Sequence, residues 1–108
     1  MNDLASKKSQ PIKSGTPALD SKRVTELLKQ LPGWQLSGDA IQKTFPFKNY
    51  HETMAFVNAT AWISHREDHH PDMEVGYNKC TMRYSTHSVE GLSENDFICA
   101  AKVEAMMK

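Results

Sequence analysis

The sequence predicts a single α+β domain with the element order α-β-β-α-β-β-α. The chain has 108 residues, of which 39% are hydrophobic, and this length suffices for one packed core but not for two. Apolar residues recur at helical spacing in three stretches and follow strand-like patterns in four short ones. We therefore expect a four-stranded antiparallel sheet with the helices packed on one face.

The first 20 residues differ in composition from the rest of the chain. They are rich in Lys, Ser and Pro and contain few bulky apolar side chains. Such a segment buries too little apolar surface to offset the entropy lost on ordering. We expect residues 1–20 to be a flexible N-terminal tail and residues 21–108 to form the domain.

A helix and a β-hairpin come first. The helix begins near Ser21, a plausible N-cap, has apolar residues at helical spacing, and ends at the breaker pair Pro32-Gly33. These apolar residues are Val24, Leu27, Leu28 and Leu31. Two short β-favouring runs follow at 34–36 and 41–47, and turn-forming residues separate them.

A long helix, a second hairpin and a last helix complete the order. Residues 49–68 contain neither Gly nor Pro, and Pro71 prevents the helix from continuing. Apolar residues alternate in 73–77 and again in 80–84, which predicts two further strands. Ser93 is a suitable N-cap for a helix that runs to the C-terminus.

Charge and cysteine content exclude several classes of protein. Thirteen Lys and Arg balance thirteen Asp and Glu, so the chain lacks the basic surface of a nucleic-acid-binding protein. Cys80 and Cys99 form no CxxC pair, and no apolar signal segment begins the chain, which favours a reduced, cytoplasmic protein. No apolar run approaches the roughly 18 residues of a membrane span.

Histidines cluster where the long helix is predicted to end. The stretch HREDHHPDME places His65, His69 and His70 within six positions, and His87 lies just past the last strand. Imidazole has an ordinary pKa of about 6.5, so neighbouring histidines can give and take protons at neutral pH. His69, His70 and His87 are therefore candidates for a reaction that needs an acid and a base together.

A metal site is the alternative for the same side chains. His65 and His69 are spaced i, i+4 on one helical face, and His70 or His87 could complete a three-nitrogen set. Pro71 turns the chain after His70, and Arg66 stands where the HExxH pattern has its glutamate. We therefore expect acid-base chemistry and no metal.

The spacing of these residues resembles the signature of the pterin-4a-carbinolamine dehydratases. The signature reads His65-x3-His69-His70-Pro71, five residues, Tyr77, nine residues, His87, eight residues, Asp96. The segments LLKQLPGW, FPFKNY, VGYN, STH and EGLSENDF occur in the family's order, so the resemblance covers residues 21–107.

The resemblance implies a hydro-lyase that needs neither a metal nor a cofactor. Its substrate would be the 4a-hydroxytetrahydropterin left by an aromatic amino-acid hydroxylase, and its products a quinonoid dihydropterin and water. The subunits of the family pair into homodimers and often homotetramers. Some animal members also act as dimerisation partners of a transcription factor, so the alternative is a non-catalytic coactivator module of the same fold.

The resemblance also indicates which residues form the site. It points to His69, His70 and His87 as the catalytic histidines, and we expect two segments to bind the substrate. These segments supply Asp68, His69, His70, Pro71, Ser85, Thr86, His87 and Ser88.

Three further positions are supporting candidates. Asp96 either favours a helix N-terminus or belongs to the site, and Trp34 belongs either to the core or to the pocket. Many relatives carry Glu where this chain has His65, so a negative charge one helical turn before His69 is absent here.

Overall fold

The structure is a computed structural model that describes residues 4–108, and it confirms the predicted α+β fold and element order. The first three residues of the expected tail lie outside the described residues. The elements are η1 (Leu4–Ser6), α1 (Ser21–Leu28), β1 (Gln35–Ser37), β2 (Ala40–Pro46), α2 (Tyr50–Glu67), β3 (Asp72–Val75), β4 (Lys79–Tyr84), η2 (His87–Val89) and α3 (Glu94–Met106).

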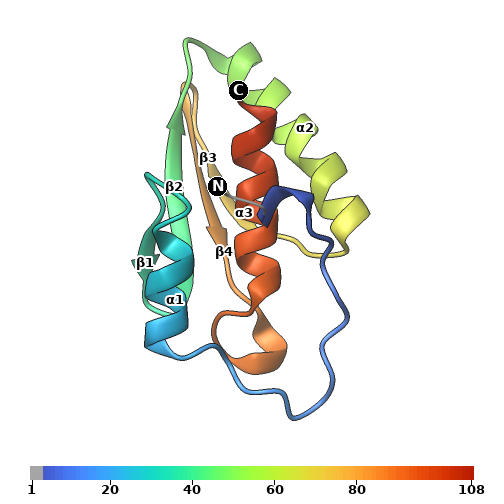
Figure 1. Cartoon of the computed structure of the whole chain (residues 1–108). Helices are drawn as coiled ribbons and strands as arrows, with labels where there is room; N and C mark the ends of the chain where they lie inside the picture. The colour runs from blue at the N-terminus through green and yellow to red at the C-terminus, as the bar shows by residue number, and fades with distance from the viewer. Residues whose placement is uncertain (1–3) are drawn as a thin grey trace.

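The four strands form one antiparallel sheet in the order β1-β2-β4-β3. Two hairpins therefore meet at the central pair β2 and β4, where Ile41 lies opposite Tyr84 and Phe45 opposite Cys80. The three α-helices lie on the same side of the sheet, with α3 in the middle (Figure 1). Strands β1 and β3 form the two edges.

Side-chain caps begin the helices close to the predicted positions. Asp20, rather than Ser21, caps α1, because its Oδ1 accepts from the backbone N–H of Arg23 at 2.9 Å. Asn49 caps α2 in the same way through the N–H of Glu52. Ser93 precedes α3, where the side chain of Asp96 accepts from its backbone N–H at 3.0 Å.

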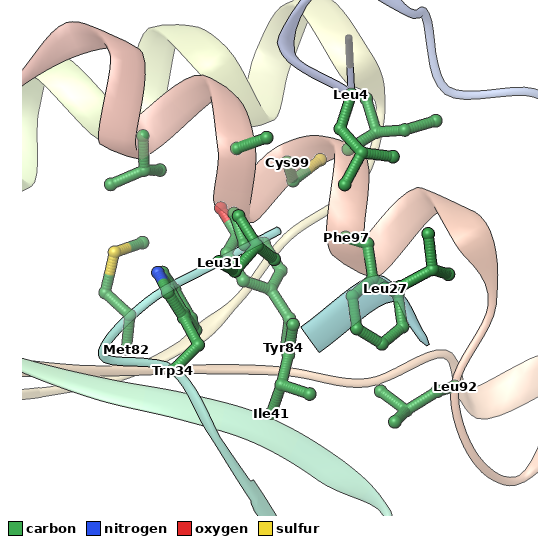
Figure 2. Close-up of a cluster of buried hydrophobic side chains, with 14 of the residues drawn as sticks. Leu4, Leu27, Leu31, Trp34, Ile41, Met82, Tyr84, Leu92, Phe97 and Cys99 are labelled. Atoms are coloured by element: carbon green, nitrogen blue, oxygen red, sulfur yellow. The ribbon is translucent and has the colours of Figure 1, made fainter. Parts of the chain in front are cut away.

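The core lies between the sheet and α3. Strand β4 alternates as predicted: Cys80, Met82 and Tyr84 are buried toward the helices. Figure 2 shows Met82 and Tyr84 together with Trp34, Ile41 and Phe97 in this core. The opposite face of the sheet is polar and includes a 2.7 Å hydroxyl contact between Thr44 and Thr81.

The buried face of α2 is mostly polar. Thr53, Phe56, Thr60, Ser64 and Glu67 are buried, whereas Tyr50 is half exposed. The hydroxyls of two of these residues donate hydrogen bonds to backbone carbonyls within α2. Thr60 donates to the carbonyl of Val57, and Ser64 donates to that of Thr60. The larger apolar side chain Trp62 is 62% exposed.

The N-terminal segment packs against the domain along the part that the structure describes. Leu4 is only 3% exposed and lies near Cys99 of α3 (Figure 2). The carbonyl of Ala5 accepts from Lys102 Nζ at 2.9 Å, and the N–H of Leu19 donates to the carbonyl of Leu92. One buried leucine and several hydrogen bonds thus join this segment to the domain, while its flexibility and the domain boundary at residue 20 stay predictions.

Within residues 4–108, no helix is both long enough and apolar enough to cross a membrane.

Candidate active site

A polar hollow of about 290 Å³ lies where the end of α2 meets the end of β4. Its lining comes from two segments, 68–72 and 85–88. The lining residues are Asp68, His69, His70, Pro71, Asp72, Ser85, Thr86, His87 and Ser88. The structure therefore brings together all eight residues expected to bind the substrate, and adds Asp72, which the sequence analysis missed although it directly follows Pro71.

The end of α2 is turned by a residue in the left-handed conformation. Asp68 has φ 51° and ψ 44°, a region that asparagine and aspartate tolerate better than most residues. The N–H of His69 reaches back to the carbonyl of Ser64 at 3.2 Å, which closes the helix end. The chain is thereby redirected, and His69 and His70 leave the helix at the rim of the hollow.

His69 is held by a carboxylate from the start of α3. Its Nε2 lies 2.5 Å from Asp96 Oδ1, and its ring stacks on that of Tyr84 with centroids 5.9 Å apart and an interplanar angle of 9°. The His69 side chain is 13% exposed and that of Asp96 is fully buried. Since an ionised carboxylate only accepts hydrogen bonds, His69 carries its hydrogen on Nε2 in this arrangement.

Asp96 serves the helix and the site with different oxygens. Oδ2 accepts from the backbone N–H of Ser93 at 3.0 Å and from the hydroxyl of Thr86 at 2.8 Å, while Oδ1 faces His69. Asp96 therefore caps the start of α3 and also contacts His69, while its part in the site stays a prediction. One buried carboxylate ties the start of α3 to both segments that line the hollow.

His87 lies in a short turn that is closed at both ends. Thr86 and Gly91 pair across it, with the N–H of Thr86 donating to the carbonyl of Gly91 at 2.8 Å. Residues 87–89 form η2, and Glu90 follows in the left-handed region with φ 53°. This turn presents His87, which is exposed, at the hollow opposite the 68–72 segment.

Two supporting candidates lie away from the hollow. Trp34 is buried in the core, where its Nε1 donates to Glu104 at 2.9 Å and its ring packs edge-on against Phe45. His65 is exposed and its ring lies 5.8 Å from that of Trp62. In the described part of the chain, no three histidine, cysteine or acidic side chains are grouped so that they could hold one metal ion.

The ring of Tyr84 stacks with that of His69, whereas the sequence predicted only that residue 84 lies in a strand. Burial, together with the neighbouring Cys99 and Asp96, raises the pKa of Tyr84, so its hydroxyl stays protonated at neutral pH. The alternation of β4 places this ring toward the helices, but only the packing of the α2 end brings His69 over it.

The arrangement is suited to proton transfer on a small polar molecule. One imidazole is oriented by a buried carboxylate, and two more lie at the same hollow beside hydroxyl groups. A larger hollow, about 720 Å³, lies between the N-terminal segment and the start of α3, but no histidine lines it. The histidines therefore identify the smaller hollow as the candidate active site.

The chain matches one protein family over most of its length. A sequence model of the family described as "Pterin 4 alpha carbinolamine dehydratase" matches residues 17–106. A relative from Nitrosospira multiformis is 56% identical over 108 residues, which cover 100% of this chain and 96% of the relative. One from Nitrosomonas europaea is 59% identical over 107 residues, covering 98% and 95%. Both carry the provisional name pterin-4-alpha-carbinolamine dehydratase.

Solved structures with the same fold include proteins of this kind. The "transcriptional coactivator/pterin dehydratase" from Brucella melitensis is 32% identical with a TM-score of 0.79, and the match covers 84% of this chain and 99% of that one. A "pterin dehydratase-like protein" described as a RuBisCO assembly factor in the alpha-carboxysome is 26% identical with a TM-score of 0.56, and the match covers 68% and 84%.

Proposed function

We propose, from the premise that this chain belongs to the pterin 4 alpha carbinolamine dehydratase family, that His69, His70 and His87 remove water from a 4a-hydroxytetrahydropterin. The members of this family are hydro-lyases by name. The observation that carries the proposal is the lining of the hollow, where all three histidines meet although 17 positions separate His70 from His87.

The proposed reaction moves one proton in each direction. The bond between C4a and its hydroxyl breaks, and a proton donor converts the leaving hydroxide into water. The proton on N5 goes to an acceptor, and the N5–H electron pair becomes the second bond between C4a and N5. No electrons are gained or lost, so an acid and a base close together account for the chemistry.

We assign the acceptor role to His69 and the donor role to His87. With its hydrogen on Nε2 and held by Asp96, the neutral ring of His69 has its lone pair on Nδ1, which is the form that accepts a proton. The carboxylate also keeps a negative charge beside the ring when it becomes cationic. His87 comes from the opposite segment, where it can supply the proton to the departing hydroxyl.

His70 and the polar edge of the hollow bind and orient the pterin in this proposal. A pterin ring presents donors and acceptors around its edge, and Ser85, Thr86 and Ser88 offer hydroxyl and backbone groups beside His70. A volume of about 290 Å³ is near the lower end of ligand-binding pockets, which fits a small bicyclic molecule.

The assembly and the physiological setting are also proposals. The exposed edges of the sheet and the exposed Trp62 favour pairing of subunits into a homodimer or homotetramer. An aromatic amino-acid hydroxylase that forms the 4a-hydroxytetrahydropterin would supply the substrate.

The decisive experiment follows the decay of freshly generated 4a-hydroxytetrahydropterin by absorbance. We expect the purified protein, without added metal or cofactor, to accelerate this decay well above the spontaneous rate. A double variant, His69→Ala with His87→Ala, is the matched control and should return the rate to the spontaneous one. A wild-type protein that leaves the rate unchanged contradicts the dehydratase proposal and favours the non-catalytic coactivator alternative.

A further inference from the structure

We propose that Glu67 is a positioning residue: through the N-terminal segment it fixes the end of α2 and so places His69 against Asp96. Glu67 is 8% exposed and lies two positions before His69, but it does not line the hollow. Its part in turnover rests on the proposed function, whereas its part in placing His69 does not.

The N-terminal segment is bound to the last turn of α2 at two consecutive residues. The backbone N–H of Ser9 donates to Glu67 Oε1 at 2.8 Å. The ammonium of Lys8 donates to the carbonyl of Arg66 at 3.2 Å, at a helix end where carbonyls have no partner within the helix. A cation there also interacts favourably with the helix dipole.

The same segment is bound to α3. Gln10 exchanges two hydrogen bonds with Asn95, its N–H donating to Oδ1 at 3.0 Å and its carbonyl accepting from Nδ2 at 2.8 Å. Lys102 donates to the carbonyl of Ala5 at 2.9 Å, and its Nζ lies 3.9 Å from Glu67 Oε2. Residues 5–10 therefore join the end of α2 to α3.

This connection spans the two elements that supply the His69–Asp96 contact. His69 follows α2 directly, and Asp96 lies in the first turn of α3, next to Asn95. A hydrogen bond of 2.5 Å between them tolerates little relative movement of the two elements. Asp68 holds a left-handed conformation between Glu67 and His69, so a stable α2 end is needed to hold that turn.

The N-terminal segment also contacts residues that follow the 85–88 segment of the hollow. The N–H of Leu19 donates to the carbonyl of Leu92 at 2.9 Å. At Gly91 an added Cβ would lie 3.0 Å from the Cβ of Ala18, so the Gly91 backbone packs closely against the Ala18 side chain. Gly91 pairs with Thr86, the residue before His87. The N-terminal segment thus contacts the end of α2, which leads into His69 and His70. It also contacts Gly91 and Leu92, and Gly91 pairs with the residue before His87.

The test compares three substitutions around the segment. Glu67→Ala removes the acceptor of the Ser9 N–H, and Glu67→Gln restores a neutral acceptor of the same length. Lys7→Ala is the matched control, because Lys7 lies in the same segment but pairs with the exposed Glu94 of α3 and not with α2. Circular dichroism reports folding for each variant.

The first readout is the NMR titration of the His69 ring in the free protein, which needs no substrate. We expect the His69 signals and their titration midpoint to change in Glu67→Ala, to recover largely in Glu67→Gln, and to stay as in the wild type in Lys7→Ala. The second readout is kinetic, and kcat should fall about tenfold in Glu67→Ala with a smaller change in KM, because a displaced catalytic group slows turnover.

Unchanged His69 signals in a folded Glu67→Ala protein would overturn the proposal, whether or not the protein is a dehydratase. If Glu67→Ala does not fold, Ser9→Pro decides instead. It removes the backbone N–H that donates to Glu67 Oε1 and changes no buried side chain. A wild-type His69 titration in that variant would equally overturn the proposal, whereas a shifted one supports it.

Discussion

His69 Nε2 lies 2.5 Å from Asp96 Oδ1, although 27 positions separate the two residues in the chain. The contact fixes the tautomer of a histidine at the hollow and occupies a carboxylate oxygen that would otherwise be buried without a partner. Helix α3 therefore supplies no lining residue itself but orients His69, the least exposed of the three histidines at the hollow.

Replacing Asp96 should destabilise the protein measurably. Asp96→Ala leaves the Ser93 N–H, the Thr86 hydroxyl and the His69 ring without their common acceptor. We expect the free energy of unfolding to fall by about 2–4 kcal/mol, because buried donors lose their partner. Urea denaturation measures the change. Asp68→Asn, at an exposed position where asparagine tolerates the left-handed backbone, should stay close to the wild type.

The histidines at the hollow should differ in their kinetic effects. His69→Ala and His87→Ala should each lower kcat by roughly 10²- to 10⁴-fold, as expected when a general base or acid is lost. His70→Ala should weaken substrate binding at least as much as it slows turnover, because an orienting group acts on the bound substrate and the transition state. Steady-state kinetics with the spontaneous rate subtracted measure both effects.

His65→Ala is the control within this series. Its ring is exposed and lies against Trp62 instead of lining the hollow, so we expect at most a few-fold change in kcat. Near-normal turnover in both His69→Ala and His87→Ala would contradict the assigned mechanism. A His65→Ala variant as inactive as those two would place His65 in the catalytic set.

Alkaline pH should destabilise the fold through buried acids. Burial raises the pKa of Cys99 to about 12, with smaller contributions from its neighbours. An unfolded thiol ionises near pH 8.5, so above about that pH the unfolded state loses a proton that the folded state keeps. The contribution of the Cys99 thiol to the free energy of unfolding is therefore complete below about pH 8.5. It decreases as the pH rises, until the folded thiol also ionises near pH 12.

The comparison that isolates Cys99 uses its own helix. Urea denaturation at pH 7 and pH 10 should show a smaller loss of stability in Cys99→Ala than in the wild type. Val103→Ala also creates space in the buried face of α3 but removes no ionisable group, so it should keep the wild-type pH dependence. Equal pH dependence in all three proteins would show that Cys99 stays neutral in both states or ionises equally in both.

The subunit should not remain a monomer. Besides the two sheet edges, the chain exposes Trp62 on α2 and Tyr77 beyond β3, the latter by 67%. We expect light scattering at micromolar concentration to give at least twice the 12.2 kDa of one chain. Trp62→Glu should lower that mass if helices meet in the assembly, whereas Lys22→Glu on α1 should not. A 12.2 kDa wild-type species is incompatible with this prediction.

The sequence by itself determined the order of the main helices and strands and indicated eight of the nine residues that line the hollow. Alternating residues in β4, the proline after His70 and the cap at Ser93 are local signals, and each depends on neighbours within a few positions. The spacing of the histidines, through its resemblance to a family signature, also indicated which two segments meet.

Only the tertiary structure decided which distant groups pair. Local spacing does not show that Asp96 reaches His69, because that contact depends on how the end of α2 packs beside the start of α3. The tertiary structure also placed Trp34 in the core, where Glu104 accepts its N–H. Leu4 is buried because folding brings α3 beside it. The composition of the N-terminal residues does not reveal this contact, because residues far along the chain form it. Which face of α2 is buried was also decided by packing: the hydroxyls of Thr60 and Ser64 lie inside and bond to carbonyls of the helix itself, whereas Trp62 is exposed.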